Sequence, residues 1–287
     1  MHDVLTNLPQ TKLECLDHGF VSLIDTMPRL VPVDRKTADY AIVQAARVSY
    51  GDGTKTINED RGLIRYLLRH THTTPFEMVE FKFHCKMPIV AARQMIRHRT
   101  ANVNEYSGRY SVMKDEFYFP NADQIRQQSK ANKQGGEEVM QEDVAKKFSE
   151  YLKTISDEAY DIYEDHIKLG VSREQARMIL PINLYTEWYW KIDLHNLLHF
   201  LALRCDSHAQ YEIRVFADAM SKLIEPIVPL AVEAWNDYHD RRGAIKLTRL
   251  EIEAIQNSIK ENRLVSLNSE NKREQEEWVN KAKKLGF

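Results

Sequence analysis

VEFKFHCKMPIVAARQMIRH, residues 79–98, contains a strand pattern followed directly by a helix pattern. From Val79 to Cys85, apolar residues alternate with charged or polar ones, which is the period of a strand with one buried face. Pro88 then opens a helix that runs into Arg97, because proline at the first helical position costs little. The sequence therefore predicts a strand that leads into a helix, with a basic segment where that helix ends.

The segments before this stretch predict one more strand and two helices. Phe20 to Met27 has the pattern of a first strand, and Thr37 to Val48 carries apolar residues at helical spacing. A second helix is expected from Asn58, whose side chain can cap its first amides, to about His70.

The segments after residue 98 alternate between helical and strand patterns. The expected elements are a polar surface connection from Asn121 to about Asp143, a helix from Val144 to Ile167, a short helix from Ser172 to near Leu180, a strand from Ile182 to Ile192, and helices that begin after Asp193 and after Ser207. Asp193 is expected to act as an N-cap, and the pairs Ser172 with Gln175 and Ser207 with Gln210 have capping-box spacing. The aromatic run Tyr185, Trp188, Tyr189 and Trp190 fits either a core or a subunit interface.

This order of elements predicts a helix-rich α+β single domain with a mixed or antiparallel sheet. Helices follow the first strand before the next strand appears, so a regular doubly wound parallel sheet is not indicated. After Trp235 the chain becomes strongly charged, with a helix capped by Thr248 and Glu251 and then a solvated tail. We expect a main domain over residues 1–240 and a charged helical C-terminal extension over residues 241–287.

The composition is that of a soluble globular protein. Lysine and arginine total 40 against 42 acidic residues, so a positive patch must come from local arrangement, and a general nucleic-acid binder is disfavoured. No apolar stretch is long enough to span a membrane, and the N-terminus lacks a secretion-signal pattern, so we expect a cytoplasmic protein. The three cysteines are scattered and odd in number, which indicates reduced thiols.

The densest chemical signal is a group of cationic side chains after the helix of residues 88–98. Five of them lie within 17 residues, opposed by Glu105 alone: Arg93, Arg97, His98, Arg99 and Arg109. A solvated helix face would usually include acidic partners at helical spacing. We expect a loop with Asn102, Asn104, Ser107 and Gly108 to follow, which offers amides, a hydroxyl and close backbone approach. Anion binding is favoured over a surface basic patch or a subunit contact.

The same stretch, RHRTANVNEYSGRYS at residues 97–111, resembles the defining motif of flavin-dependent thymidylate synthases, which is Arg-His-Arg, seven residues and then Ser. The motif residues are Arg97, His98, Arg99 and Ser107, with further matches at Asn104, Glu105, Arg109, Tyr110 and Ser111. Asn102 departs from the pattern, since many members have serine there. HTTPFE at residues 72–77 and LRCDSHAQYEIR at residues 203–214 are similar to upstream and downstream segments of the family, so the likeness covers roughly Asp17 to Trp235.

The resemblance implies a homotetramer whose active sites are shared between subunits and hold FAD and dUMP. Its expected FAD contacts are Thr74, Arg97, His98, Arg99 and Glu105, with Asp193, His195 and His199 from a neighbouring chain. Its expected dUMP contacts are Gln94, Met95, Ile96, Arg97, Glu105, Tyr106, Ser107, Gly108, Arg109, Arg177 and Arg204. No G-x-G-x-x-G follows a predicted strand, so FAD is expected to bind without a Rossmann fingerprint.

The family's chemistry also implies a catalytic role for Arg204, beside the uracil ring, where a fixed cation favours loss of the N3 proton. The carbon donor is then 5,10-methylenetetrahydrofolate, and flavin reduced by NADPH supplies a hydride. No enzyme nucleophile is required, whereas ordinary thymidylate synthase uses a cysteine in a Pro-Cys context that is absent here. We interpret Cys205, next to Arg204, as a small buried residue at a helix end, and Ser107 as a binding residue.

Two other classes of protein compete with this interpretation. A metal-dependent hydrolase could use His195 and His199, four residues apart, with further histidines at positions 70, 72, 98 and 208, although H-E-x-x-H is absent and we expect no metal. An RNA-binding module could use the same arginines with Tyr106, Tyr110 and Tyr118 as stacking surfaces. Near-neutral net charge and the lack of an RNA-recognition motif weaken this second alternative.

Overall fold

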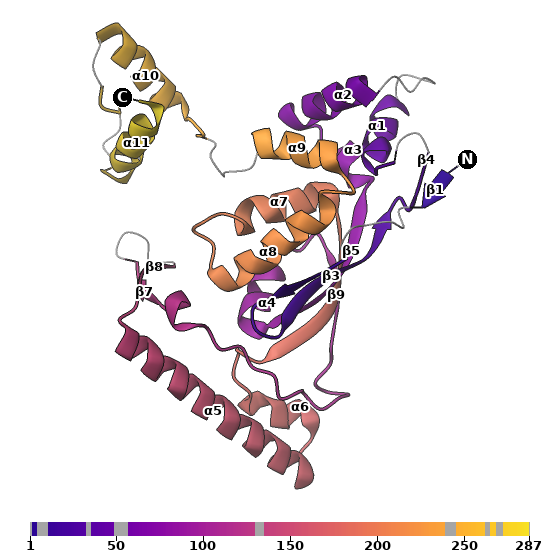
Figure 1. The fold of residues 1–287 in the computed structure, drawn as a ribbon, viewed down its shortest axis with the longest axis vertical. Coiled ribbons are helices and arrows are strands. Elements are labelled where there is room, and N and C mark those ends of the chain that lie inside the picture. Colours follow the sequence, from indigo (N-terminus) through magenta and orange to yellow (C-terminus); the bar gives the residue numbers. More distant parts are fainter. Residues whose placement is uncertain are drawn as a thin grey trace. The chain divides into compact units, whose positions relative to one another are not determined.

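The computed structural model describes residues 2–4, 11–32, 36–48, 57–129, 135–238, 245–261, 265–267 and 272–286. The chain separates into two compact units, Met1–Tyr238 and His239–Phe287, and each is described by itself. The first unit contains the central sheet and most of the helices (Figure 1).

The central sheet of the first unit has five strands in the order β2-β3-β5-β9-β6, and every neighbouring pair is antiparallel. Its strands are β2 (Lys12–Cys15), β3 (Gly19–Met27), β5 (Glu80–Pro88), β6 (Asn102–Glu105) and β9 (Tyr185–Asp193). Two smaller pairs are β1 (His2–Val4) with β4 (Leu30–Pro32) and β7 (Arg126–Gln128) with β8 (Gly136–Val139). The strands predicted from Phe20, Val79 and Ile182 are therefore confirmed, and together they form the middle of the sheet.

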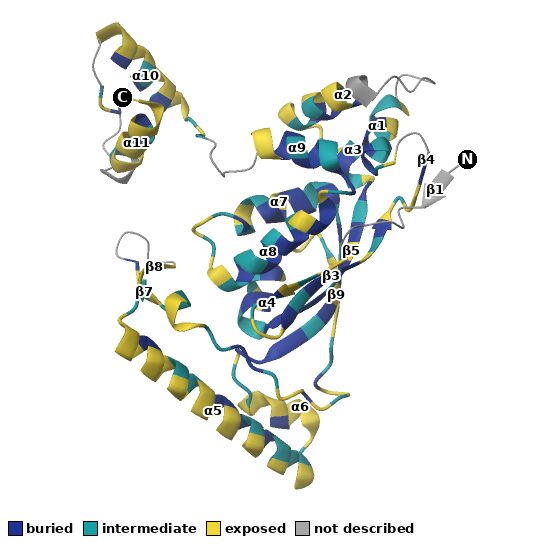
Figure 2. Cartoon of the chain, viewed as in Figure 1, coloured by how far each residue is buried: buried dark blue, intermediate teal, exposed yellow. Residues whose placement is uncertain are grey.

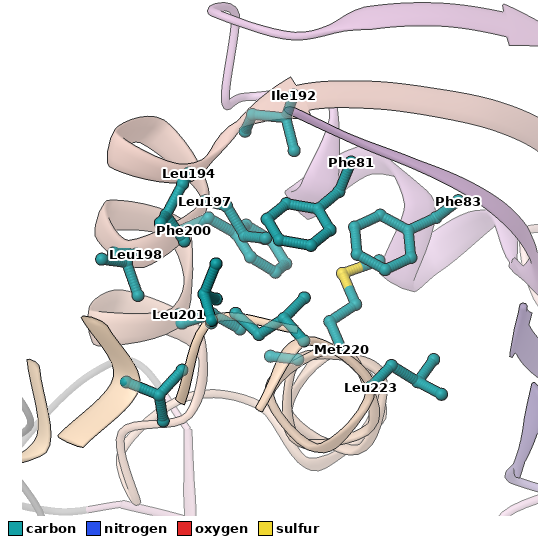
Figure 3. Packing of buried hydrophobic residues seen from close by; sticks show 14 of the residues in the cluster. Phe81, Phe83, Ile192, Leu194, Leu197, Leu198, Phe200, Leu201, Met220 and Leu223 are labelled. Carbon is teal, nitrogen blue, oxygen red and sulfur yellow. The ribbon is translucent and has the colours of Figure 1, made fainter. Parts of the chain in front are cut away.

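Helices cover one face of the central sheet. The helices of the first unit are α1 (Asp39–Arg47), α2 (Ile57–Arg69), α3 (Thr74–Glu77), α4 (Ile89–Met95), α5 (Glu142–Lys168), α6 (Arg173–Ala176), α7 (Leu194–Arg204), α8 (Tyr211–Ile224) and α9 (Pro229–Tyr238), with short 3-10 turns η2 (Ala122–Gln124) and η3 (Arg177–Ile179). Among them, α4, α7 and α8 contact the central strands, whereas α5 and α6 lie apart from the sheet. Phe81 and Phe83 of β5 point toward Phe200 of α7 and Met220 of α8, as Figure 3 shows, and all four side chains are buried. The alternation seen in the sequence of β5 places these apolar residues on the helix-covered face.

Of the expected helix caps in the first unit, the one at Asp193 is confirmed. Asp193 Oδ1 accepts a hydrogen bond from Asn196 N at 2.9 Å, which satisfies a free amide at the start of α7. The two serine caps are wrong, because neither side chain bonds a backbone amide at its helix start, and α8 begins after Gln210. Ser172 Oγ instead donates to the side chain of Gln175 at 3.3 Å. The predicted cap at Asn58 involves a side chain outside the described residues.

A second, smaller core joins α5 and α6 to the chain before and after them. It contains Met113, Phe117, Tyr163, Ala176 and Leu184. Met113 N donates a hydrogen bond to Tyr163 OH at 2.9 Å, which joins α5 to the segment before it. The polar connection expected from residue 121 to 143 includes the η2 turn and the antiparallel pair β7 and β8, so its described residues contain more regular structure than its composition indicated.

The second unit is a pair of helices, α10 (Arg249–Glu261) and α11 (Lys272–Leu285), with its own small core. The capping box predicted at its start is confirmed, since Thr248 N donates to Glu251 Oε2 at 2.6 Å and Glu251 N donates to Thr248 Oγ1 at 3.3 Å. The expected solvated tail is wrong, because Trp278 of α11 is completely buried and packs with Ala254 and Leu267.

A helix-rich α+β fold with an antiparallel sheet is therefore confirmed. Dark blue strands beneath α7 and α8 in Figure 2 show that the main core lies between the sheet and these helices. Within the described part of the chain, no helix is both long enough and apolar enough to cross a membrane.

Candidate functional site

The first group of candidate residues lies where the turn after α4 meets the end of α7. Arg204 Nε donates to His98 Nε2 at 3.2 Å. The other nitrogens of this guanidinium reach Gln94, with Nη1 3.5 Å from its side-chain oxygen and Nη2 3.4 Å from its carbonyl oxygen. Gln94 Nε2 in turn donates to Gln210 Oε1. We call Gln94, His98, Arg204 and Gln210 the Arg204 cluster.

Local structure places Arg204 and His98 beside each other. Asp193 caps α7, and Arg204 is the last residue of this 11-residue helix, where the helix dipole favours a cation. α4 ends at Met95, whose carbonyl accepts a hydrogen bond from His98 N at 3.0 Å. This turn directs the imidazole of His98 toward α7.

The guanidinium of Arg204 is partly buried and has neutral acceptors only. Its partners are the imidazole of His98 and two oxygens of Gln94, one from the side-chain amide and one from the backbone, and no carboxylate of the described residues pairs with it. Burial lowers the pKa of Arg204 from its ordinary value, yet arginine remains charged at neutral pH. The site therefore holds a cation that an anionic ligand can approach without displacing an internal ion pair.

His98 is the neutral acceptor that orients Arg204. Burial, followed by the charges of Arg204 and His199, lowers the pKa of His98 to about 4. A neutral ring that accepts at Nε2 carries its proton on Nδ1. The ring also packs edge-on against Phe200 with centroids 4.9 Å apart, and the ring of His199 lies 6.1 Å away.

A second group of candidates surrounds Gly108. A Cβ atom on Gly108 would lie 2.7 Å from Met113 Sδ and 3.2 Å from Arg177 Cδ, so glycine allows Arg177 to approach the backbone closely. The carbonyl of Ser107 accepts hydrogen bonds from Tyr110 N and Ser111 N, both at 3.1 Å, which folds the segment into a turn. We call Ser107, Gly108, Arg109 and Arg177 the Gly108 cluster.

The expectation of cations without acidic partners holds for most of the basic segment. Among the described residues, Arg93, Arg97, Arg99 and Arg177 form no ion pair, and Arg97, Arg99 and Arg177 are exposed. Arg109 differs, because its Nε lies 3.2 Å from Glu174 Oε2 across an exposed contact. An exposed pair of this kind contributes little and can yield to an anion.

The expected loop after Arg99 contains an edge strand. β6 pairs with β9, with Asn104 opposite Tyr189 and Glu105 opposite Trp188. Glu105 Oε1 accepts a hydrogen bond from Thr186 Oγ1 at 2.7 Å, which orients its carboxylate. Strand pairing thus fixes the first half of the segment that the sequence presented as a loop.

Two of the expected nucleotide contacts have side chains already engaged in the protein. Met95 is completely buried, and Tyr106 OH donates to the carbonyl of Val112 at 2.7 Å. The two sequence neighbours of Met95 are accessible to a ligand, since Gln94 is half-buried and Ile96 is 46% exposed.

The remaining candidates lie on α3 and α7. Thr74 is exposed at the first position of α3, which packs against α7. His195 and His199 are separated by one turn of α7, half-buried and exposed respectively. Both oxygens of Asp193 are occupied by Asn196, through its backbone amide and its side-chain amide. No hydrogen bond, ion pair or ring contact of the described residues joins the Arg204 cluster to the Gly108 cluster.

The geometry does not support the competing interpretations. Within the described ranges, no three His, Cys, Asp or Glu side chains are grouped so that they could hold a metal ion. Tyr118 is only 4% exposed and its hydroxyl donates to Glu212, so it cannot stack on a base. Cys205 is buried at the end of α7, as expected.

Sequence reasoning missed several supporting residues. Gln210 had been assigned to a helix cap, but its side chain holds Gln94. Thr186, which orients Glu105, lies within the aromatic strand β9, where its sequence context does not single it out. Met113 lies beside Gly108. None belongs to a motif with an evident chemical role, so only the tertiary contacts reveal them.

Comparisons with known proteins point to one family. The family model described as "Thymidylate synthase complementing protein" matches residues 29–230. The chain is 56% identical over 284 residues to a flavin-dependent thymidylate synthase of Dictyostelium discoideum, covering 99% of this chain and 90% of the relative. It is 53% identical over 240 residues to the protein of that name from Thermus thermophilus, covering 84% of this chain and 83% of the relative.

A solved structure is similar in fold. A UMP/dUMP methylase, PolB, from Streptomyces cacaoi, bound with 5-Br dUMP, is similar with a TM-score of 0.69 and 30% sequence identity. The similarity covers 79% of this chain and 99% of that chain. The similarity therefore extends over almost the whole length of PolB.

Proposed function

Because the chain belongs to the family of flavin-dependent thymidylate synthases, we propose that it converts dUMP to dTMP by reductive methylation. It is a methyltransferase that uses FAD, with 5,10-methylenetetrahydrofolate as carbon donor and NADPH as reductant. The observation that carries the proposal is the Arg204 guanidinium, held by His98 and Gln94 and without a carboxylate partner among the described residues.

The Gly108 cluster has the chemistry to bind the phosphate of dUMP. Gly108 is buried, and because it has no Cβ atom, the side chain of Arg177 lies close to its backbone. Ser107 adds a hydroxyl and Arg109 a second guanidinium, and arginine donates to phosphate in a planar fork. Glu174 shields Arg109 in the free protein, and phosphate would replace this exposed partner.

Arg204 is proposed to act on the base of dUMP. A guanidinium beside the uracil ring stabilises negative charge that develops when the N3 proton leaves, and this raises electron density at C5. His98 and Gln94 fix the guanidinium plane in advance, so it does not reorganise during the reaction. Gln210 is a positioning residue, since it acts on Arg204 only through Gln94.

The residues around Arg97 fit a flavin nucleotide. Arg97 and Arg99 are exposed and form no ion pair with described residues, which leaves their donors for the diphosphate of FAD. The described strands of the central sheet pair antiparallel, which supports our proposal that FAD binds without a Rossmann βαβ unit. When bound, FAD reduced by NADPH supplies the hydride that completes the methyl group.

No cysteine of the chain is suited to attack the uracil ring. Cys15, Cys85 and Cys205 are buried, and none of them forms a disulfide. Burial raises the pKa of Cys15 to about 12 and raises that of Cys85 as well, so both thiols stay protonated at neutral pH. A mechanism without an enzyme nucleophile agrees with these environments.

We propose a homotetramer with shared active sites in the cytoplasm. Within one chain, no hydrogen bond, ion pair or ring contact of the described residues joins the Arg204 and Gly108 clusters, which is expected if a neighbouring subunit completes each site. Asp193, His195 and His199 are then the contribution of that neighbour to FAD binding. Residues 1–240 are proposed as the catalytic domain and residues 241–287 as a helical extension, which lies outside the matched family region.

The visible spectrum of the purified protein tests this function. A flavoenzyme shows absorbance bands in the blue region that bleach when NADPH is added, and dTMP accumulates when dUMP and methylenetetrahydrofolate are supplied. A colourless preparation that binds no added FAD but contains stoichiometric zinc would contradict the proposal and favour a metal-dependent hydrolase.

A further inference from the structure

The turn around Gly108 is held by side chains on two sides. Tyr106 OH donates to the carbonyl of Val112 at 2.7 Å, so the two ends of the turn are joined to each other. On the side of α6, Arg173 Nη1 donates to the carbonyl of Tyr110 at 2.8 Å. The turn therefore has a defined shape, and its position depends on the helices beside it.

Two tyrosines of α5 hold the residue that follows this turn. Met113 N donates to Tyr163 OH, and Tyr160 OH donates to the carbonyl of Met113, both at 2.9 Å. The tyrosines are three residues apart, so their side chains lie on one face of the helix. No backbone group of the described residues bonds Met113, which is only 7% exposed. The two hydroxyls therefore satisfy both backbone polar groups of a buried residue.

The side chain of Met113 lies against the backbone of Gly108. A Cβ atom on Gly108 would lie 2.7 Å from Met113 Sδ and 3.2 Å from Arg177 Cδ, so both side chains occupy the space beside this glycine. Met113, Tyr163 and Ala176 belong to one core, and Ala176 directly precedes Arg177 in the sequence. A displaced Met113 would therefore leave Gly108 and Arg177 without their common neighbour.

Packing fixes the rings of the two tyrosines. Tyr163 is completely buried, and its ring centroid lies 5.7 Å from that of Tyr160. The ring of Tyr160 is also edge-on to Phe117, with centroids 6.2 Å apart. Burial, followed by the charge of Glu164, raises the pKa of Tyr160, so its hydroxyl keeps the proton that it donates to Met113. Both hydroxyls are therefore at fixed positions before any ligand binds.

We propose that Tyr160 and Tyr163 are positioning residues for nucleotide binding: through Met113 they hold the Gly108 turn beside Arg177 before the phosphate arrives. The inference rests on the proposed binding of dUMP by the Gly108 cluster, and it gives a role to α5, which carries no residue of that cluster. A preformed phosphate site lowers the cost of ordering the turn on binding. The phosphate takes no part in methyl transfer, so loss of a hydroxyl should weaken binding without slowing the bound complex.

Removal of one hydroxyl tests the inference in the FAD-bound enzyme. Tyr160→Phe should raise the Kd of dUMP about fivefold, with kcat changed by less than about twofold, because only binding is affected. The inhibition constant of 2′-deoxyuridine, which lacks the phosphate, should change by less than about twofold against dUMP. Tyr185→Phe is the matched control, since this hydroxyl donates to Asp17 outside both clusters, and it should leave all three quantities unchanged.

A double-mutant cycle tests the route through Met113. Gly108→Ala already displaces Met113 or Arg177, so the loss of the Tyr160 hydroxyl should matter less in that background. We expect Tyr160→Phe to raise the Kd of dUMP by less than about twofold when Gly108→Ala is present, against about fivefold when it is absent. The same fold-change in both backgrounds would show that Tyr160 acts independently of Gly108 and would overturn the inference.

This inference and the proposed function fail in different ways. If the wild-type enzyme binds dUMP, and Tyr160→Phe binds it equally well or loses dUMP and 2′-deoxyuridine in equal measure, the tyrosines do not position the phosphate site, although the function stands. If the FAD-bound wild type does not bind dUMP, the proposed function is wrong and this inference falls with it. Should Tyr160→Phe lose its circular dichroism signal, Tyr163→Phe decides by the same measurements, because it also removes a hydroxyl and keeps the ring.

Discussion

Arg204 Nε donates a hydrogen bond to His98 Nε2 at 3.2 Å, although the two residues are 106 positions apart in the sequence. This bond joins the end of α7 to the turn after α4. The bond requires a neutral His98, and it fixes the plane of the guanidinium, which we propose lies beside the uracil ring of dUMP. The predictions below follow from this contact and from the elements that support it.

Acidification should weaken the folded state through His98. The pKa of His98 is lowered to about 4 in the fold against 6.5 for an unperturbed ring, so the unfolded chain binds this proton more readily. The contribution of His98 to stability is therefore complete above about pH 6.5 and is lost as the pH falls toward 4. After allowance for partial solvent exposure, we expect a loss of about 1–2 kcal/mol. Urea unfolding at pH 7.5 and pH 5 measures it, and His98→Gln should lose less over the same range.

Adding a methyl group at Gly108 should weaken dUMP binding. The new Cβ atom would displace Met113 or Arg177, so Gly108→Ala should raise the dissociation constant of dUMP about tenfold, or ~1.4 kcal/mol, with FAD absorbance unchanged. Gly62→Ala is the matched control, because a Cβ atom there meets nothing within 4 Å. This control should bind dUMP normally and gain about 0.5–1 kcal/mol of stability within α2. Equal dUMP affinities in both variants would remove Gly108 from the phosphate site.

Several elements could be predicted from the sequence because their signals are local. The alternation in β5 and the cap at Asp193 each depend on residues within a few positions of one another. Strand β6 was missed because its asparagines have low strand propensity and its partner β9 lies about eighty residues later. The buried Trp278 was missed because charged neighbours conceal it.

The candidate site also combines features that local sequence predicts with contacts that it does not predict. The motif at residues 97–111 indicated which residues bind anions, but spacing could not place His98 against Arg204. The cap expected at Ser207 failed because α8 starts three residues later, and Gln210 bonds Gln94 instead. Contacts between distant segments depend on how the helices pack on the sheet, and no local pattern encodes them.

Removing the cap of α7 should cost stability in a way that asparagine restores. Asp193→Ala leaves Asn196 N without its acceptor, and we expect the free energy of unfolding to fall by about 1 kcal/mol. Asp193→Asn keeps a side-chain oxygen and should recover most of that loss. Thermal unfolding of both variants measures it, and a smaller loss for alanine than for asparagine would contradict the capping role.

Disrupting the core of the second unit should leave the chemistry intact. Trp278 is completely buried, and its Nε1 donates to the carbonyl of Val265 at 3.0 Å. Trp278→Ala should destabilise this unit by about 3–5 kcal/mol. Two measurements detect this: the change in tryptophan fluorescence on unfolding of the unit is lost, and proteases cut the chain after Tyr238 sooner than in the wild type. The rate of dTMP formation per bound FAD should remain within twofold of the wild type. A tenfold loss would give the extension a part in catalysis.

The role of Arg204 is tested most directly by measuring dTMP formation and bound flavin in the same Arg204→Ala preparation. Arg29→Ala serves as the control, because Arg29 is exposed and pairs with Asp25 outside both clusters. We predict that Arg204→Ala retains FAD absorbance but loses at least a thousandfold in the rate of methyl transfer, or about 4 kcal/mol of transition-state stabilisation, while Arg29→Ala stays active. Methyl transfer near the wild-type rate by the flavin-bound Arg204→Ala enzyme would contradict the proposed action of this guanidinium on the uracil ring.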